Sequence, residues 1–503
     1  MTHMRVPEVA LAFMVTIYSN VYSQNRGNVW MIGNDYYEFH NGGEDFNSGM
    51  LDTFSLFRHM SMFTTHGMIC DTNGNLLMYT NGQWIANGTH DTIKNSEHFN
   101  PGYITDTFYC APICYGSGIN QGALILPHPG SLVLYDIFHL SGDFINNFKA
   151  QSFHLGHSVV DMSLNNGEGE MILKDDHLID DTLTFGRLTA CKHANGRDWW
   201  LIHHQFNTDR YYKFLITPDS IFGPFSQDIG QSIYSDNSGL ACFSPDGNYY
   251  AMISPVDNHN LDILKFDRCS GEFTDVIVSE VLPSFPTYWW LSVAFSPSSR
   301  FLYASSLDEI WQYDLQAVDV LGSKKLVATW DTLYAIFTTQ FFLSQLAPDS
   351  KIYFSTAGSD SLQHVINQPD EEGIACEVLQ NFNGIKLPTD NVSLPNLPNY
   401  DLGALPGSPC DTLTGIADLG FSIADLRVQP NPASDWLNIV YRTNEDAVFE
   451  LFDLYGHPMA EVQLYRYFKN RLLRVSALPA GVYAYQIKVS GEKVKEGKVA
   501  VVH

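Results

Sequence analysis

Two groups of histidines are the first residues in the chain that could support chemistry. His193, His203 and His204 form one group, and His154 and His157 form the other. Imidazole side chains bind transition metals and transfer protons near neutral pH. Adjacent residues of a strand point to opposite faces of a sheet, so His203 and His204 do not readily bind the same ion. We therefore assign no metal-ligating residue to either group.

Pairs of carboxylates are the second set of residues with chemical potential. Glycoside hydrolysis needs two carboxyl groups about 5–10 Å apart, one on each side of the scissile bond. Sequence spacing places no two of these residues at that separation, so we interpret the pairs as charges on solvent-exposed loops. The pairs are Asp175-Asp176, Asp180-Asp181 and Glu371-Glu372.

The segment Asp71–Asn75, DTNGN, has the composition of a calcium-binding loop. Its glycine is the fourth residue, however, and Gly82 and Gln83 stand where an EF-hand loop would end on glutamate. Asn and Gly tolerate the positive φ of a tight hairpin, so we favour a β-turn. Ca²⁺ is left open as a cofactor, and the sequence indicates no other.

Sequence motifs of common enzymes are absent from the chain. It has no G-x-S-x-G, no H-E-x-x-H and no phosphate-binding glycine-rich loop with lysine. Trp199-Trp200, Tyr288-Trp289-Trp290 and Trp311 could stack on sugar rings, but they lie beside repeated turns, which favours packing in the core. We identify no catalytic or cofactor-binding residue, and the sequence leans towards a protein that is not an enzyme.

The elements that would position these side chains are short strands, and they repeat. In each repeat a small or apolar strand enters a Gly/Asp/Asn/Ser turn and an aromatic strand leaves it. The last four turns fall about 51 residues apart, a period typical of β-propeller blades. The six passages are Cys70–Thr80, Leu126–Phe138, Cys191–His203, Phe243–Ile253, Phe295–Ser305 and Leu346–Thr356.

These repeats predict an all-β protein with a β-propeller over residues 24–400. Asn28–His40 is similar to the second half of a blade, and we expect Asn391–Tyr400 to supply the first half and close the ring. This arrangement gives seven blades, and six blades with irregular outer strands are the alternative. In the first half of the repeat region the polar segments His90–Tyr103 and Gly142–Asp181 predict long loops.

The charge balance restricts the class of partner. The chain has 55 acidic and 28 basic residues and a net charge of −27. Such a field repels phosphate backbones, which excludes nucleic acid as an expected partner. The chain has eight cysteines, and an even number in an exported protein permits disulfides. Cys376 and Cys410 flank the stretch that closes the ring, so we expect a disulfide between them.

The N-terminal 23 residues have the features of an export signal. Val9–Ile17 is a short apolar run, and Val21 and Ser23 are small residues before Gln24, so we expect cleavage between Ser23 and Gln24. Nine apolar residues are too few to cross a bilayer, and no other segment of the sequence is long and apolar enough to do so.

The amino-acid composition of the chain changes after residue 400. Residues 401–420 are rich in Gly, Pro and Asp and predict a linker. Residues 421–503 alternate apolar and polar positions between turn residues, which predicts a small Ig-like β-sandwich. Pro430 and Pro432 cannot donate to a sheet ladder, so they must lie at a strand end or a sheet edge.

This C-terminal unit resembles the type A sorting domain that Bacteroidetes proteins carry for the type IX secretion system. Three motifs carry the resemblance, in the order of the family. The resemblance implies export across both membranes, handling by the secretion machinery through residues 421–503, and removal of the domain at release or attachment. The motif residues are Pro430, Asn431, Pro432, Ala433, Ser434 and Asp435, then Phe452, Asp453, Leu454, Tyr455 and Gly456, then Leu478, Pro479, Ala480, Gly481, Val482 and Tyr483.

The larger region resembles secreted Bacteroidetes propeller proteins of the WD-repeat type, through NVWMIG, EDFNSG, DTNGNLLMYT and SLPNLPNYDLGALPGSPCDTL. The resemblance implies a fold and an extracellular or outer-membrane surface location, and it brings no catalytic residues. We therefore expect a binding protein for a polysaccharide, a protein or an envelope component. A secreted hydrolase or lyase acting on polymers, and a structural surface or motility component, are the alternatives.

Overall fold

The computed structural model describes the greater part of the chain from residue 25 onwards. The expected signal segment and its cleavage site, Ser23 and Gln24, lie outside the described residues. The described ranges are 25–34, 40–108, 116–146, 149–233, 239–254, 260–282, 290–333, 337–358, 361–382, 392–410, 423–443, 446–466, 468, 470–489 and 492–502.

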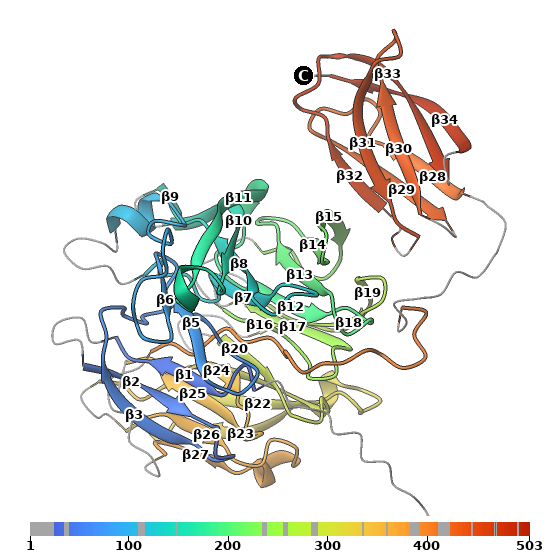
Figure 1. Ribbon diagram of the computed structural model, residues 1–503. Helices are drawn as coiled ribbons and strands as arrows, with labels where there is room; N and C mark the ends of the chain where they lie inside the picture. The colour runs from blue at the N-terminus through green and yellow to red at the C-terminus, as the bar shows by residue number, and fades with distance from the viewer. Residues whose placement is uncertain are drawn as a thin grey trace, which may run out of the picture.

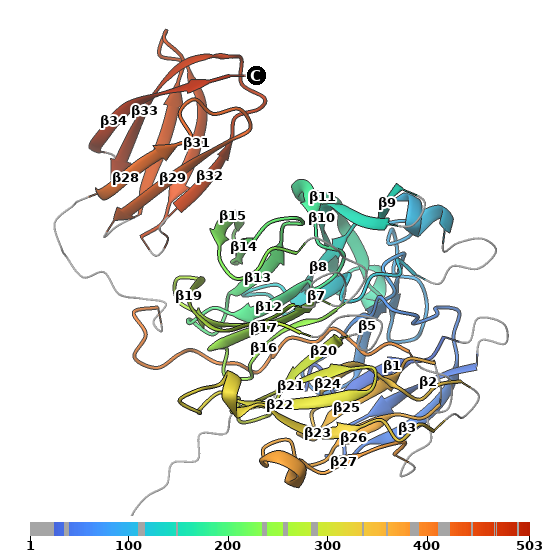
Figure 2. The ribbon, with the colours of Figure 1, turned by 180° about the vertical axis from the view of Figure 1, so that it is seen from behind.

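Seven antiparallel sheets follow one another along the chain and stand around a common centre, which is the arrangement of a β-propeller (Figures 1 and 2). In each sheet the strands pair in chain order, except for the third sheet, where β9 pairs only with β10. The first four sheets are β1 (Val29–Ile32), β2 (His40–Asp45) and β3 (Asp52–Phe57); β4 (Gly67–Cys70), β5 (Leu76–Thr80) and β6 (Ile85–Asn87); β7 (Ala123–Pro127), β8 (Leu134–Leu140), β9 (Asp143–Asn146), β10 (Lys149–Asp161) and β11 (Glu170–Leu183); and β12 (Thr189–Lys192), β13 (Trp199–His204), β14 (Arg210–Ile216) and β15 (Ile221–Asp228).

The remaining three sheets of the ring have four strands each, so the structure has the seven blades favoured by the sequence. They are β16 (Ala241–Phe243), β17 (Tyr249–Ser254), β18 (Asn260–Asp267) and β19 (Glu272–Val281); β20 (Trp290–Phe295), β21 (Phe301–Ser306), β22 (Glu309–Asp314) and β23 (Lys325–Thr329); and β24 (Phe341–Leu346), β25 (Ile352–Thr356), β26 (His364–Ile366) and β27 (Val378–Leu379). Short helical turns cover Ile104–Phe108, Asn165–Gly167, Leu321–Ser323 and Gly373–Cys376.

The six repeated passages of the sequence all fall on the same part of a sheet. Each of them is the turn between the first and second strands, as in β4–β5 or β24–β25. Burial explains why this part repeats best. Strands near the centre, such as β7, are buried at every position, whereas most residues of the outer strand β19 are exposed or partly exposed.

The ring closes by packing of the first sheet against the last. Trp30 and Phe46 of the first sheet region contact Tyr353 of β25, with ring centroids 6.2 and 5.9 Å away. Gln363 donates a hydrogen bond of 2.8 Å to the buried Glu44 carboxylate, across 319 positions of sequence. Aromatic packing of this kind buries a large apolar area at the one junction that the chain does not connect.

The predicted role of Asn391–Tyr400 is wrong. The described part of this segment forms no strand and does not complete the first sheet. Residues 392–410, here called the strap, instead cross the middle of the ring, as the orange trace in Figures 1 and 2 shows. Its sequence, SLPNLPNYDLG, contains two prolines that cannot donate to a ladder, which is why it passes across the sheets rather than joining one.

The predicted long loop at Gly142–Asp181 is also different in the structure. Most of it forms β9 and the long hairpin β10–β11, whose register shifts at several bulges. The bulges break the strict alternation of apolar and polar residues, so the sequence pattern of a strand was hidden.

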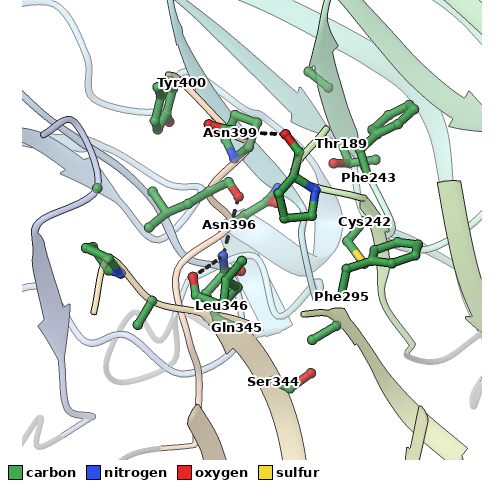
Figure 3. A pocket seen from close by; sticks show the side chains of 18 of the residues that line it. Thr189, Cys242, Phe243, Phe295, Ser344, Gln345, Leu346, Asn396, Asn399 and Tyr400 are labelled. Atoms are coloured by element: carbon green, nitrogen blue, oxygen red, sulfur yellow. Dashed lines mark hydrogen bonds between the residues drawn. The ribbon is translucent and has the colours of Figure 1, made fainter. Parts of the chain in front are cut away.

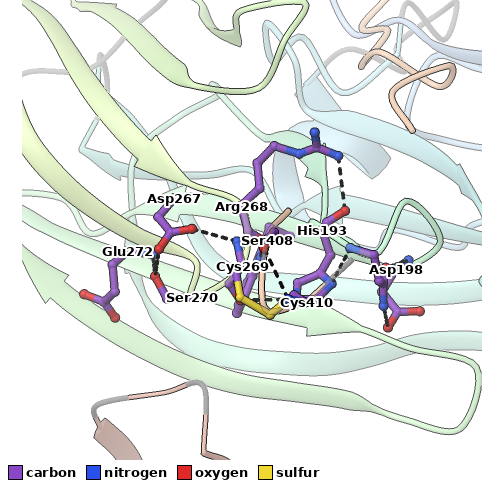
Figure 4. Close-up of a disulfide and its surroundings, with 11 residues drawn as sticks. His193, Asp198, Asp267, Arg268, Cys269, Ser270, Glu272, Ser408 and Cys410 are labelled. Carbon is purple, nitrogen blue, oxygen red and sulfur yellow. Dashed lines mark hydrogen bonds between the residues drawn. A yellow bond between two sulfur atoms is a disulfide. The ribbon is translucent and has the colours of Figure 1, made fainter. Parts of the chain in front are cut away.

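The expected disulfide between Cys376 and Cys410 is wrong. Cys410 is bonded to Cys269, at a Cα–Cα distance of 5.6 Å, and Cys376 is a buried free thiol (Figure 4). The strap carries Cys410 across the ring to the β18–β19 turn, whereas Cys376 stays in the last sheet beside Tyr303. The bond therefore attaches the end of the strap to the fifth sheet.

The C-terminal residues form a separate sandwich of two sheets. One sheet has the order β28-β29-β32 and the other β31-β30-β33-β34. Buried residues alternate along β29 and β30, as period-2 patterning predicts. The strands are β28 (Ile423–Gln429), β29 (Trp436–Thr443), β30 (Ala447–Phe452), β31 (Pro458–Leu464), β32 (Asn470–Arg474), β33 (Gly481–Val489) and β34 (Glu492–Val501).

An aromatic contact joins the sandwich to the fourth sheet of the ring. Phe468, which precedes β32, stacks on Phe225 of β15 with centroids 4.1 Å apart and meets Trp200 edge-on at 5.2 Å. Asn470 donates a 3.0 Å hydrogen bond to the Ser226 carbonyl, and the Arg471 guanidinium lies over the Phe225 ring. The loop before β32 and β32 itself therefore contact the propeller.

Removal of the strap disulfide should destabilise the protein. A bond between residues separated by 141 positions restricts the unfolded chain strongly, so Cys410→Ser should lower the free energy of unfolding by about 4 kcal/mol. Denaturant titration of Cys410→Ser, Cys269→Ser and the double variant measures this, and the three should agree because each removes the same bond. Peptide mapping without reductant that recovers a cross-link to Cys376 would contradict the pairing.

Protonation of Glu44 should make stability depend on pH. Burial raises the pKa of Glu44 from 4.5 to about 7, so between these values the folded protein holds a proton that the unfolded chain has released. The native state is therefore favoured fully below pH 4.5 and loses this contribution as the pH rises to about 7. Glu44→Gln should be the more stable protein at pH 7, by up to about 3 kcal/mol. The free energies of unfolding of Glu44→Gln and the wild type, measured from pH 4 to 8, should differ increasingly up to pH 7 and by a constant amount above it. A difference that is constant over the whole range would contradict the raised pKa of Glu44.

Candidate functional site

A cavity of about 280 Å³ lies at the centre of the ring (Figure 3). The first strands of four sheets contribute to its wall, with Thr189 from β12, Phe243 from β16, Phe295 from β20 and Leu346 from β24. Strap residues 396–401 form another part of the wall. The cavity is therefore the central channel of the propeller, narrowed by the strap.

One side chain of the strap holds it in this position. The Asn396 amide donates hydrogen bonds of 3.1 and 2.9 Å to the carbonyls of Ala123 and Leu188, and its oxygen accepts one from Gln121. Its backbone amide also donates to the His66 carbonyl at 2.8 Å. A single buried asparagine thus links the strap to three neighbouring sheet regions. A hydrogen-bonded group of this kind is costly to leave unpaired, so the strap is fixed at this point.

Two further residues fix the strap beyond Asn396. The Tyr400 hydroxyl donates to the Ile125 carbonyl at 2.8 Å, and the Asn399 amide donates to the Pro245 carbonyl at 2.7 Å. Arg268 donates to the Gly403 carbonyl just before the disulfide. The side-chain amides of Asn396 and Asn399 are used in these contacts. Their main role is therefore to fix the shape of the cavity wall and not to bind a ligand.

The cavity wall carries few charged side chains. Among its lining residues Asp401 is the one carboxylate and Arg26 the one cation, and histidine is not represented. Phe243, Leu346 and Leu397 are partly exposed and give the wall an apolar character. A pair of carboxylates for general acid–base hydrolysis is therefore not present among the residues that line it.

The histidines of the first sequence group are structural. His203 and His204 are buried, and each contacts a backbone carbonyl, of Thr184 and Gln205 respectively. Burial and the nearby Arg187 charge lower the pKa of both to about 3, so they stay neutral. The His193 ring lies 3.1 Å from the Cys269 carbonyl, next to the disulfide (Figure 4).

The histidines of the second group, His154 and His157, belong to different clusters on opposite faces of β10. His157 lies 2.8 Å from the buried Asp136, which also contacts His128 at 2.9 Å. Burial tends to raise the pKa of Asp136, but the hydrogen bonds from His128 and His157 outweigh it and the pKa is lowered. His154 instead faces Asp175 and His177.

The carboxylate pairs of the third sheet are on a strand and not on loops, contrary to the prediction. Asp175, Asp176, Asp180 and Asp181 all lie in β11, where Asp181 accepts a 2.6 Å hydrogen bond from the Tyr212 hydroxyl. Glu371 and Glu372 lie before the helical turn Gly373–Cys376, and Glu372 forms an ion pair with Lys325.

The remaining candidates serve the fold. Asp71 accepts hydrogen bonds of 2.8 and 2.9 Å from the amides of Asn73 and Asn75, which closes the turn. Trp199 and Trp200 are fully buried, in agreement with core packing. Tyr288 and Trp289 lie outside the described residues.

The sorting-motif residues form turns in the sandwich, and one of them joins a turn to β34 by hydrogen bonds. The Asn431 side chain donates to the Lys498 carbonyl at 3.2 Å and accepts from the Ala500 amide at 2.9 Å, so the proline motif is tied to β34. Asp453 accepts from the Tyr455 and His457 amides in the β30–β31 turn, where Gly456 has φ +85°. Pro430, Pro432, Asp435, Leu478 and Pro479 also lie in connections between strands, whereas Gly481 and Tyr483 belong to β33, and the Tyr483 hydroxyl donates to the Pro479 carbonyl.

The cavity residues were missed at the sequence level. Asn396 and Gln121 are isolated amides in segments without a chemical motif, and their meeting depends on the path of the strap. The only signal in the sequence is the repeated Leu-Pro-Asn of residues 394–399, which indicates an extended segment but not its location.

Comparison with protein families identifies the C-terminal unit. Residues 427–501 match the model described as the secretion system C-terminal sorting domain. The match agrees with the expected sorting domain, implies handling by type IX secretion machinery, and indicates secretion or a cell-surface location. Within the described residues no helix has the length and apolar character needed to span a bilayer. Comparison with curated proteins gives no match.

Solved structures similar to this chain are propeller proteins of low sequence identity. A protein from Lactobacillus plantarum shares 12% identity with a TM-score of 0.43, over 73% of this chain and 98% of that chain. The Cps50 (Swd1) β-propeller domain of Myceliophteria thermophila shares 11% with a TM-score of 0.36, over 66% and 94%. The periplasmic gluconolactonase of Pseudomonas aeruginosa shares 15% with a TM-score of 0.30, over 73% and 96%. From its own sheet order and the matched sorting domain, this chain is a β-propeller protein that ends in a secretion-system sorting domain.

Proposed function

We propose that the protein is an exported binding protein whose propeller holds a small, uncharged, hydroxyl-rich ligand in the central cavity, such as the terminal residue of an extracellular polysaccharide. The observation that carries the proposal is the composition of that cavity. It combines apolar side chains with uncharged polar residues such as Gln121, Ser344 and Gln345, and has one carboxylate and one cation on its wall.

The size and the walls of the cavity support this class of ligand. About 280 Å³ is at the lower end of the range for small-molecule sites, which favours one ring over a long segment of polymer. Phe243, Leu346 and Leu397 offer surfaces against which the apolar face of a sugar ring can pack. The charge of −27 on the whole chain disfavours anionic ligands at a distance.

A rigid wall supports binding without a conformational change. The strap is fixed by Asn396, Asn399 and Tyr400 and is covalently attached through Cys410, so the cavity exists before a ligand arrives. Pre-organised sites lose less conformational entropy on binding.

Filling the cavity should abolish binding. Leu346→Trp places a larger side chain in the cavity and should weaken retention on immobilised neutral oligosaccharides by at least about tenfold. Retention is measured with the full chain on arrays of neutral and anionic oligosaccharides, and every eluate is analysed for shortened products. Val318→Trp is the matched control, because Val318 is fully exposed in the β22–β23 connection, and it should bind as the wild type does.

Three results would contradict the proposal. Shortened products from the wild type would show that the protein is a hydrolase or lyase. Equal retention of the wild type and Leu346→Trp would show that the ligand binds outside the channel, and retention of neither would favour a structural role at the cell surface.

A further inference from the structure

A second cluster of chemical groups lies on the long hairpin β10–β11, away from the channel cavity. His154 of β10 is paired with Asp180 of β11, and Gly156 is paired with His177. Residues 154 and 156 share a face of the sheet because side chains alternate along a strand. The pairing therefore brings two histidines and a carboxylate together on one face of the hairpin.

The distances within this cluster are those of groups that can share an ion. One nitrogen or oxygen atom from each of His154, His177 and Asp180 lies within 4.8 Å of the other two. The two imidazole rings stack with centroids 3.8 Å apart, and His177 Nδ1 lies 2.7 Å from Asp180. Asp175 adds a second carboxylate, with oxygens 3.6 Å from the Nε2 atoms of both His154 and His177.

Glycine and backbone geometry make room for the cluster. A Cβ atom on Gly156 would lie 2.7 Å from Asp175 Oδ1 and would also meet the His139 ring, so the space above this glycine is filled by the cluster itself. Asp175 has φ +50°, in the left-handed region that a non-glycine residue rarely adopts. A bulge next to Asp175 turns its side chain towards the histidines.

Buried polar atoms in the cluster lack hydrogen-bond partners. They include His154 Nε2, Asp175 Oδ1 and Nδ1 of the fully buried His139. Buried groups of this kind normally have a partner, and a bound ion would supply one. The His154 nitrogen and the Asp175 oxygen lie 3.6 Å apart, and His177 and Asp180 lie beside them.

We propose that His154, His177 and Asp180 bind one divalent transition-metal ion of the Zn²⁺ class. Asp175 is the fourth ligand and the second carboxylate of the site. Two imidazoles with carboxylates suit zinc and its neighbours, whereas Ca²⁺ prefers six or more oxygen ligands. The His157–Asp136–His128 cluster on the other face of β10 is not part of this site.

Binding at this site would fasten the two longest strands of the ring to each other. The β10–β11 register shifts at its bulges, so a metal bridging His154 with His177 and Asp180 would fix the register at that place. Arg474 of the sandwich lies 3.7 Å from Asp180, and a metal would compete with this cation for the same carboxylate.

Metal titration of the purified full chain tests the proposal. After treatment with a chelator, the wild type should bind one Zn²⁺ per chain by calorimetry, and Co²⁺ should give the visible absorption of a nitrogen-and-oxygen site. His177→Ala removes a half-exposed ligand and should weaken Zn²⁺ binding by at least about tenfold, as should His154→Ala. Ca²⁺ at the same concentration should not displace Co²⁺.

Controls separate the cluster from other histidines and from the Arg474 ion pair. His98→Ala removes an exposed histidine that lies 3.5 Å from Asp106, and it should leave Zn²⁺ affinity unchanged. Arg474→Gln should leave the affinity unchanged or increase it, whereas Asp180→Asn should decrease it. A variant that fails to fold is recognised by its circular dichroism, and His177→Ala, on the exposed side, decides the test. No zinc binding by the wild type, or equal binding by wild type and His177→Ala, would overturn the proposal.

Discussion

A ring of sheets is closed only if its first and last members pack against each other, and the chain itself does not connect them. Here the junction is made by Trp30 and Phe46 against Tyr353, and by the hydrogen bond from Gln363 to Glu44. Aromatic burial supplies most of the attraction, since the buried carboxylate opposes folding once it ionises. The rest of the ring depends on this contact, because the channel and its cavity exist only while the circle is complete.

The strap adds a second form of closure that is independent of sheet pairing. It links the regions of Ala123, Leu188 and Pro245, which belong to three different sheets, by side-chain amides. A propeller that completes a blade with strands from both ends of the chain relies on backbone ladders for this purpose. In this protein, polar side chains and a disulfide of the strap close the ring instead of backbone ladders. A cavity remains beside the strap.

The sequence allowed prediction of the parts that follow local periodicity. The turns at Phe243–Ile253 and its relatives indicated six blades, and Asn28–His40 indicated a seventh. Motifs such as Pro430-Asn431-Pro432 identified the sorting domain, which the family comparison confirms. In contrast, the Cys269–Cys410 bond and the contacts of Asn396 join distant residues whose meeting depends on the path of the strap. The His154–His177–Asp180 cluster was also not predictable, because bulges in β10–β11 decide which residues face each other.

The two proposed sites lie on different parts of the ring. The central cavity is built from first strands, which the surrounding blades hold rigidly. The histidine cluster is on a long outer hairpin, where β-bulges allow unusual side-chain positions. A glycan held at the channel and a metal ion on the hairpin would act on different parts of one rigid body, with no need for one to transmit a change to the other.

The position of the strap disulfide has a mechanical consequence for export. The sorting domain is at the C-terminal end, so any force applied to it during transport reaches the propeller through residues after 410. Cys410 passes part of that force to Cys269 in the β18–β19 turn, which lowers the load on residues 392–409. The hydrogen bonds of Asn396 and Tyr400 are thereby shielded from part of the load. A force applied to the sorting domain therefore acts less on the strap contacts at the centre of the ring.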